Sequence, residues 1–352
     1  MKIGILTFHW ATNYGAVLQT YALQSFLESI GHEVTIINYK PRNFDNSIWR
    51  YIINRNFMHH ALYCEGLKKE SAIVPFREKY LNLTNRVYRL TKITDVTHNL
   101  DMVISGSDQV LNPSFLLNGE GRRIPSAAYY LGFSFKGVKV GYAVSFGCTE
   151  FPVNALSLAK QNITNFDKIG VREETGIEIV KAMGREDAVL VPDPTLLLGS
   201  ESYKKLAEDS QAQTPEIYKY CFFIRNIEAR KEQLSSFFGD NVLWNNDDAN
   251  YSLNDWLRKI KNASFVVTDS FHCMVMCLKL HKPFVVVTAN KGNVGMNDRF
   301  YTLLSPMLLS SRIIYFEDIA RLDVMKKELI DWQNVDSYLD LYPSIAEEFL
   351  RK

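Results

Sequence analysis

The sequence predicts an α/β protein of two doubly wound, Rossmann-like domains that face a cleft. Three observations support this fold class. Short apolar runs of strand length alternate with segments whose apolar residues recur at helical spacing. The alternation occurs twice, before and after the polar stretch from Gly199 to Pro215. The chain has 352 residues, which is enough for about two domains at roughly 150 residues each.

The start of the chain shows one strand, helix and strand in succession. Ile3–Phe8 is a compact apolar run, which is typical of a strand buried on both faces. A polar loop, His9–Gly15, leads to Val17–Ser29, whose apolar residues have helical spacing. Gly31 marks the end of this helix, because glycine tolerates the left-handed conformation there. Val34–Asn38 is predicted to be the next strand.

The rest of the chain continues this alternation. Residues 41–99 mix aromatic residues with paired charges and are predicted to form helices inserted between strands. Later helices are predicted over Asn254–Lys261, Ser270–Leu280 and Ser344–Arg351. The remaining predicted strands are Met102–Ser105, Lys139–Ser145, Lys168–Val171, Val189–Val191, Tyr220–Ile224, Val242–Trp244, Phe265–Thr268, Phe284–Thr288 and Ile313–Phe316.

The domain boundary is predicted from composition. Pro192, Pro194 and the polar stretch after them separate an N-terminal domain, residues 1–200, from a C-terminal domain, residues 215–335. Residues 336–352 are predicted to form a C-terminal helix that packs back on the N-terminal domain.

Composition excludes several classes of protein. The chain has 40 Lys+Arg against 39 Asp+Glu, a net charge of +1, which argues against nucleic-acid binding and against broad attraction to membrane surfaces. Its five cysteines form no C-x-x-C pair and no zinc spacing, as expected for reduced thiols of a cytoplasmic protein. No apolar run approaches the ~20 residues that cross a bilayer, and the N-terminus lacks a secretion signal.

Ligands of open parallel sheets bind beyond the carboxyl ends of the strands. This rule selects the loops after Phe8, Ser105, Ser145, Val171 and Thr268. The loop after Phe8 carries Asn13 and Tyr14 into a helix N-terminus, where free N–H groups and the helix dipole favour anions or sugar hydroxyls. The alternative is that Asn13 only caps the helix. No G-x-G-x-x-G or P-loop sequence occurs.

Two further strand ends carry side chains suited to anions. Asp269 or Ser270 can cap the helix that follows Thr268, and His272 lies in its first turn with an imidazole that titrates near neutral pH. The alternative for His272 is a histidine bonded to backbone beneath a loop. Arg172 follows another strand end and suits carboxylate or phosphate groups, or else forms an ion pair with Glu173 or Glu174. Lys291 and Arg299, in the glycine-containing loop from 290 to 299, form a second candidate anion clamp.

Taken together, these segments resemble the polysaccharide pyruvyltransferase family. The resemblance extends over roughly residues 3 to 310 and rests on many short runs in the same order. The matching runs are Asn13–Gln24, Gly106–Pro113, Tyr142–Gly147, Val171–Glu173, Pro192–Thr195, Thr268–His272, Lys282–Phe284 and Arg299–Phe300.

The resemblance implies a fold like that of GT-B glycosyltransferases and a specific reaction. Members move a pyruvyl group from phosphoenolpyruvate onto two sugar hydroxyls and leave a cyclic ketal on a bacterial exopolysaccharide or capsule glycan. Galactose is a common acceptor, and a lipid-linked repeat unit is one candidate intermediate, which would bring the protein to the inner membrane. The implied scheme needs no metal or cofactor, and the two cysteines Cys273 and Cys277, four residues apart, are expected to be packed thiols.

The resemblance also implies roles for site residues. Arg172 would bind anionic groups of the donor, and His272 would bind the donor phosphate or act as a general acid. The family's later basic residue corresponds to Arg299, with Lys291 as a competitor. The other substrate-binding candidates are Asp269, Ser270 and Phe271 near the donor, Asn13, Tyr14, Asp108, Gln109 and Asn112 on the acceptor side, and Ser145.

The chain departs from the family pattern at three positions, and two of them, Cys273 and Ser270, keep the possibility of an idle relative open. Cys273 replaces a common glycine and could narrow the donor pocket, Leu111 replaces a common tryptophan and could change acceptor stacking, and Ser270 replaces an arginine of some relatives. One alternative is a GT-B-type glycosyltransferase that uses a nucleotide sugar. The other is a catalytically idle relative that binds glycans.

Overall fold

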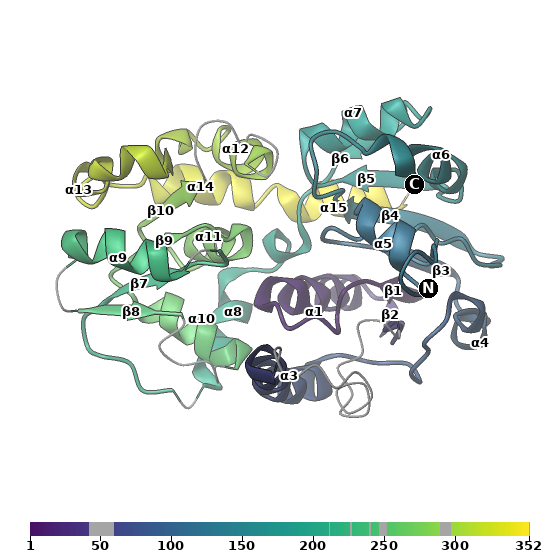
Figure 1. Ribbon diagram of the computed structural model, residues 1–352, viewed down its shortest axis with the longest axis horizontal. Coiled ribbons are helices and arrows are strands. Elements are labelled where there is room, and N and C mark those ends of the chain that lie inside the picture. The colour runs from purple at the N-terminus through teal and green to yellow at the C-terminus, as the bar shows by residue number, and fades with distance from the viewer. Residues whose placement is uncertain are drawn as a thin grey trace. The chain divides into compact units, whose positions relative to one another are not determined.

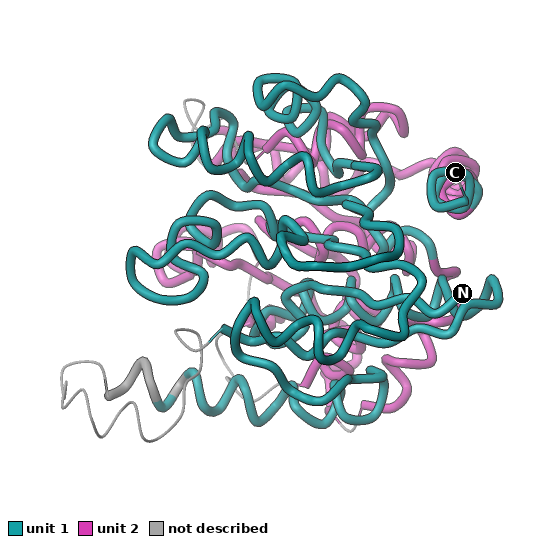
Figure 2. Tube along the Cα trace, turned by 90° about the vertical axis from the view of Figure 1, so that its right-hand side faces the viewer, with its two compact units in different colours: residues 1–197, 344–352 teal, residues 198–343 magenta. Residues whose placement is uncertain are grey.

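The strands of this protein form two sheets in which every strand pair is parallel. The computed structural model describes residues 1–41, 60–210, 212–225, 227–238, 241–245, 252–288 and 297–351. Unit 1 comprises Met1–Leu197 and Ser344–Lys352, and unit 2 comprises Leu198–Pro343 (Figures 1 and 2). The predicted fold class, two Rossmann-like domains, is confirmed.

The sheet of unit 1 has the order β2-β1-β3-β4-β5-β6. Its direction of winding therefore reverses between β1 and β3, which is where ligands of such sheets bind. The strands are β1 (Lys2–Leu6), β2 (Glu33–Ile36), β3 (Met102–Ser105), β4 (Val138–Val144), β5 (Lys168–Val171) and β6 (Val189–Leu190). The helices of this part are α1 (Tyr14–Ser29), α3 (His60–Tyr80), α4 (Thr94–Thr97), α5 (Pro113–Asn118), α6 (Val153–Ile163) and α7 (Glu174–Ala182), with short 3-10 helices η3 (Leu90–Lys92) and η4 (Pro194–Leu196).

The sheet of unit 2 has the order β11-β10-β9-β7-β8, so its winding reverses between β7 and β9. The strands are β7 (Lys219–Phe222), β8 (Val242–Trp244), β9 (Phe265–Thr268), β10 (Phe284–Thr288) and β11 (Ile313–Tyr315). The helices are α8 (Ser200–Glu208), α9 (Ile227–Phe238), α10 (Leu253–Asn262), α11 (Phe271–Lys279), α12 (Asp298–Leu304), α13 (Leu322–Met325) and α14 (Trp332–Leu339), with 3-10 helices η6 (Ser310–Arg312) and η7 (Phe316–Arg321).

Each strand predicted from the sequence is present, with ends that differ by at most two residues. The first helix differs more, because α1 begins at Tyr14 rather than Val17. Asn13 caps it there by accepting hydrogen bonds from two backbone N–H groups of the first turn, at 2.8 and 3.4 Å. Gly31, after the end of α1, has φ +90°, as predicted.

The stretch from Gly199 to Pro215 is largely helical rather than an extended connection. It contains α8, whose residues Tyr203 and Leu206 are buried. The helix packs against α10, and the Asn254 amide donates to the Leu206 carbonyl over 2.7 Å. The polar character of this stretch comes from the exposed face of an amphipathic helix.

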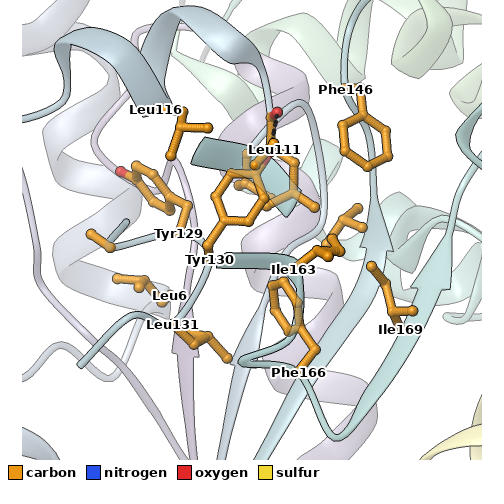
Figure 3. Packing of buried hydrophobic residues seen from close by; sticks show 14 of the residues in the cluster. Leu6, Leu111, Leu116, Tyr129, Tyr130, Leu131, Phe146, Ile163, Phe166 and Ile169 are labelled. Carbon is orange, nitrogen blue, oxygen red and sulfur yellow. Dashed lines mark hydrogen bonds between the residues drawn. The ribbon is translucent and has the colours of Figure 1, made fainter. Parts of the chain in front are cut away.

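A large apolar cluster packs beneath the strand-end loops of unit 1 (Figure 3). Leu111 and Phe146, which follow the ends of β3 and β4, belong to this cluster together with Tyr130 and Phe166. Leu111 has no exposed surface. Leu111 therefore contributes to the core, and the expected effect of this replacement on acceptor stacking stays a prediction.

Helix α15 (Tyr342–Arg351) ends the chain, and its residues from Ser344 onward belong to unit 1. The ring of Phe349 lies 6.0 Å from that of Tyr142 on β4, measured between centroids. Gly170 on β5 permits this approach, because a Cβ there would lie 3.0 Å from Cζ of Phe349.

Candidate substrate-binding sites

A buried hydrogen-bond network joins the ends of β1 and β3 in unit 1. The Gln19 amide, on α1, donates to Thr7 Oγ1 over 2.8 Å. Thr7 Oγ1 donates to the Ser107 carbonyl over 3.1 Å, and the Ser107 N–H donates to Gln19 Oε1 over 3.1 Å. All three side chains are fully buried. The two loops at the reversal point of this sheet are therefore held to each other by side chains that solvent does not reach.

The same network continues to the ends of β5 and β6. Ser107 Oγ lies 3.3 Å from Asp193 Oδ2, to which it donates. The other oxygen of Asp193 accepts from the N–H and the hydroxyl of Thr195, at 3.0 and 2.6 Å. Arg172 donates from Nη1 to Asp193 Oδ2 over 3.0 Å. Four of the runs that carry the family resemblance thus meet at one edge of the sheet of unit 1.

Arg172 is enclosed by three carboxylates. Besides Asp193, its guanidinium lies 3.6 Å from Asp108 and 3.4 Å from Glu173, and its side chain is 1% exposed. Burial by itself would lower the pKa of Arg172, but the attraction of the three carboxylates outweighs burial and raises it. The ion pair with Glu173, the alternative considered for this arginine, is present. The surrounding negative charge disfavours a further anion, so the geometry favours a structural role, and donor binding by Arg172 stays a prediction.

The acceptor-side candidates after β3 and β4 do come together. A Cβ added to Gly147, which has φ +65°, would lie 2.6 Å from Gln109 Oε1 and 2.8 Å from Asn112 Nδ2. The Ser145 hydroxyl accepts from the Gly147 N–H over 3.3 Å, and the Ser145 N–H donates to the Asp108 carbonyl over 2.9 Å. The Asp108 side chain is 17% exposed. The amides of Gln109 and Asn112 and the hydroxyl of Ser145 therefore lie around one turn of backbone, whereas the Asp108 carboxylate faces Arg172. Amide and hydroxyl groups suit sugar hydroxyls.

The loop after β1 holds the remaining acceptor-side candidates. Asn13 caps α1 and is exposed, and Tyr14 is half-buried at the first position of that helix. Arg77, on α3, donates from Nη2 to the carbonyls of Trp10 and Ala11, over 3.0 and 2.6 Å. Arg77 was not found from the sequence, because α3 lies in the segment from 41 to 99 whose apolar residues show no clear period.

In unit 2, the turn from β9 into α11 resolves the choice between two helix caps. Ser270 is the cap, since its hydroxyl accepts from the Cys273 N–H over 3.4 Å. Asp269 points elsewhere: its two carboxylate oxygens accept from the N–H groups of Ile224, over 2.7 Å, and Arg225, over 3.3 Å. Burial raises the pKa of Asp269, and these two hydrogen bonds oppose the shift.

The first turn of α11 carries the donor-side candidates Phe271 and His272. His272 is 7% exposed, and its ring lies edge-on to that of Phe271, with 5.4 Å between centroids. The Arg299 guanidinium, on α12, lies 5.6 Å from the centre of the Phe271 ring and 5.4 Å from that of Phe300. The structure therefore brings Arg299 to the residue next to His272. Lys291 lies outside the described residues.

The cysteines of α11 face the core. Cys273 and Cys277 have no exposed surface. Burial first, and then the hydrogen bond between the two thiols, raises the pKa of Cys277. Cys273 has no exposed surface and lies in hydrogen-bond contact with Cys277, and its expected narrowing of the donor pocket stays a prediction. Among the described residues, no three His, Cys, Asp or Glu side chains converge as metal ligands would. No helix within the described ranges is long and apolar enough to cross a membrane.

The fold defines the structural class of this protein, which consists of two Rossmann-like domains of the GT-B type. The chain belongs to the polysaccharide pyruvyl transferase family, because the sequence model of that family matches residues 13–290. The matched region contains the described acceptor-side residues and the turn from β9 into α11. A comparison with curated proteins finds no match.

Solved structures with the same fold include UDP-GlcNAc 2-epimerases. The enzyme from Methanocaldococcus jannaschii in complex with UDP-GlcNAc and UDP is 12% identical, with a TM-score of 0.54, and the likeness covers 100% of this chain and 99% of that one. The enzyme from Rickettsia bellii is 9% identical, with a TM-score of 0.52 and coverage of 100% and 98%. At these identities the likeness shows the fold alone.

Proposed function

We propose that this protein transfers the pyruvyl group of phosphoenolpyruvate onto two hydroxyls of a sugar and forms a cyclic ketal. The sugar is galactose in a bacterial exopolysaccharide or capsule intermediate, which a lipid carrier can present at the cytoplasmic face of the inner membrane. The family match over residues 13–290 carries the proposal. The arrangement of polar residues at the strand ends of both units supports it.

The donor is assigned to the first turn of α11. Phosphoenolpyruvate carries a phosphate and a carboxylate, and the N–H groups at a helix N-terminus favour such anions. His272 lies in that turn, and its imidazole can serve as a proton donor. Arg299 adds a guanidinium beside Phe271. The acceptor is assigned to the turn around Gly147, where Gln109 and Asn112 offer donors and acceptors for hydroxyl groups. Asp108, just before them in the chain, is assigned to the same side.

The proposed reaction begins with protonation of the donor's methylene carbon, with His272 as the acid. One sugar hydroxyl attacks the cationic carbon that results and loses its proton. The bond from this carbon to the phosphate oxygen then breaks, and inorganic phosphate leaves with the electron pair. The second hydroxyl attacks the same carbon, loses its proton and closes the ketal ring. Fixed cations stabilise the charge on the departing phosphate, and the scheme requires no metal or cofactor.

The test is a turnover assay on the purified full chain with phosphoenolpyruvate and galactosyl oligosaccharides. We expect release of inorganic phosphate and a ketal methyl signal in the NMR spectrum of the product, both unchanged by a metal chelator. His272→Ala should abolish both signals, whereas His281→Ala, which changes an exposed histidine of the same unit, should keep them. Release of UDP from a nucleotide sugar instead would support a glycosyltransferase. Saccharide binding without turnover, indifferent to His272→Ala, would support an idle glycan-binding protein.

A further inference from the structure

The loop that follows β7 lies at the reversal point of the sheet of unit 2. Strands β7 and β9 are neighbours and parallel, with Phe222 paired to Thr268 at their carboxyl ends (Figure 1). The chain continues from β7 into residues 223–225 and from β9 into the first turn of α11. Residues 223–225 therefore lie at the same sheet edge as the proposed donor site.

Asp269 joins these two loops. Its Oδ1 accepts from the Ile224 N–H over 2.7 Å, and its Oδ2 accepts from the Arg225 N–H over 3.3 Å. Both oxygens are engaged by backbone, and the buried Arg230 of α9 attracts the same carboxylate. This contact sets the backbone of residue 225 relative to the turn that leads to His272. The contacts that the structure shows for Asp269 are thus with this loop, and substrate binding by Asp269 stays a prediction.

The side chain of Arg225 supplies an exposed positive charge at this edge. A phosphate and a carboxylate together carry about three negative charges near neutral pH, more than one histidine and one guanidinium neutralise. Ser270 adds no charge, and its hydroxyl already accepts from the Cys273 N–H. A planar guanidinium is well suited to either anionic group, because it can donate two parallel hydrogen bonds.

We propose that Arg225 binds an anionic group of the donor and that Asp269 is the positioning residue that places it. The inference rests on the proposed function of the same site and adds a second arginine to it. The Arg299 guanidinium, on α12, lies over the Phe271 ring in the first turn of α11, and the backbone of Arg225, in the loop after β7, contacts Asp269 just before that turn. Two guanidiniums from separate elements can engage the phosphate and the carboxylate of one donor.

Steady-state kinetics on the full chain test the role of Arg225. We expect Arg225→Ala to raise KM for phosphoenolpyruvate by roughly 10- to 100-fold, the effect of losing hydrogen bonds to a charged group, with KM for the acceptor unchanged. Arg225→Lys should recover part of this loss. Lys261→Ala is the matched control, because it also removes a cation from unit 2. Lys261 lies at the end of α10, just before the start of β9, whereas the proposed donor site follows the end of β9. A KM for phosphoenolpyruvate that does not change in Arg225→Ala would overturn the proposal.

The positioning role of Asp269 has its own readout. Asp269→Asn keeps one carbonyl oxygen as an acceptor but turns an N–H donor toward backbone N–H groups. KM for phosphoenolpyruvate should therefore rise, and the melting temperature should fall. KM for the acceptor should stay at its wild-type value, which a general loss of folding would not produce. Equal changes in both KM values would contradict a positioning role.

Direct binding separates this inference from the proposed function. Calorimetric titration with phosphoenolpyruvate, inorganic phosphate and pyruvate compares wild type with Arg225→Ala. Weaker phosphate binding in the variant identifies the phosphate as the partner of Arg225, and weaker pyruvate binding identifies the carboxylate. If the wild type binds phosphate but transfers no pyruvyl group, the proposed function fails, and a loss of phosphate affinity in Arg225→Ala still supports the anion site. Equal affinities of wild type and variant for all three ligands would overturn the proposal that Arg225 binds an anionic group of the donor.

Discussion

At the scale of single residues, Arg172 shows how a buried arginine of unit 1 affects the interpretation of mutations at the carboxyl ends of the strands. Arg172 faces three carboxylates and has 1% of its side chain exposed. Removing one partner of a buried ionic cluster leaves the opposite charges without compensation. A loss of activity in Arg172→Ala would therefore report a damaged loop edge as readily as a lost donor contact.

The first prediction concerns that cluster. Arg172→Ala should lower the free energy of unfolding of unit 1 by about 3–5 kcal/mol, the usual cost of breaking a buried ion pair. Urea denaturation followed by circular dichroism measures this, with Arg89→Ala, an exposed arginine of the same unit, as the control. Unchanged stability in Arg172→Ala would show that the three carboxylates do not depend on its charge.

His9 is a second buried residue with a measurable consequence. Its Nδ1 lies 3.2 Å from the Thr7 carbonyl and its Nε2 lies 3.1 Å from the Asn38 side chain. Burial, with a smaller contribution from the charge of Arg77, lowers the pKa of His9 from 6.5 to about 4. The folded protein therefore holds this imidazole neutral at pH values where the unfolded chain protonates it.

The second prediction follows from that shift. Between pH 6.5 and 4 the unfolded chain binds more protons at His9 than the folded chain does, so stability is full above pH 6.5 and falls as the pH is lowered. The loss should approach about 3 kcal/mol across this window. Urea midpoints at several pH values measure it. His9→Gln should lose less stability than wild type over the same range, and parallel curves would exclude His9 as the cause.

At the scale of elements, helix α15 shows how a distant segment completes unit 1. It brings Phe349 against Tyr142 on β4 and over Gly170 on β5. Ala346 and Leu350 of the same helix are buried. The amphipathic pattern of this segment predicts a helix, and the fit at Gly170 shows why a side chain on β5 would obstruct its packing.

The third prediction tests this packing. Phe349→Ala should destabilise unit 1 by about 1–3 kcal/mol, below the range for fully buried phenylalanines because this ring is half-buried. Ile345→Ala, at a position that is 42% exposed on the same helix, is the control and should change stability little. Melting temperatures of the three proteins give the comparison. Similar losses in both variants would indicate fraying of the helix rather than a specific contact.

At the scale of the whole molecule, the question is which donor the folded chain binds. The family match indicates pyruvyl transfer, whereas solved structures of the same fold include an epimerase in complex with UDP-GlcNAc and UDP. Both kinds of ligand carry phosphate, so a phosphate site by itself does not separate them. The increase in thermal stability that each ligand gives to the intact chain distinguishes the two kinds of donor.

The fourth prediction is made at this scale. Phosphoenolpyruvate at about 100 times its dissociation constant should add roughly 2.7 kcal/mol of stability, and UDP-GlcNAc at the same concentration should add none. Thermal unfolding of wild type and His272→Ala measures the shift, which the variant should lack. A shift with UDP-GlcNAc instead would move the assignment to a nucleotide-sugar enzyme. Equal phosphoenolpyruvate shifts in both proteins would place the donor away from His272.

The sequence by itself determined the fold class, the strands and the family. Strands of a parallel sheet are buried on both faces, so each reads as a continuous apolar run such as Phe284–Thr288. Several family runs, such as Gly106–Pro113 and Thr268–His272, lie at the carboxyl ends of strands, where short polar segments follow apolar ones. Where apolar residues recur without clear spacing, as in the segment that contains α3 and Arg77, the sequence did not predict the individual helices or the contacts of their side chains.

Only the tertiary structure decided what each polar side chain contacts. Arg172 could bind a ligand or pair with an acid, and Asp269 could cap a helix or bind a substrate. Residues far apart in the chain settle both: Asp108 and Asp193 surround Arg172, and the N–H groups of Ile224 and Arg225 engage Asp269. The physical reason is that a hydrogen bond or an ion pair depends on distances of a few ångströms between segments, which local spacing along the sequence does not encode.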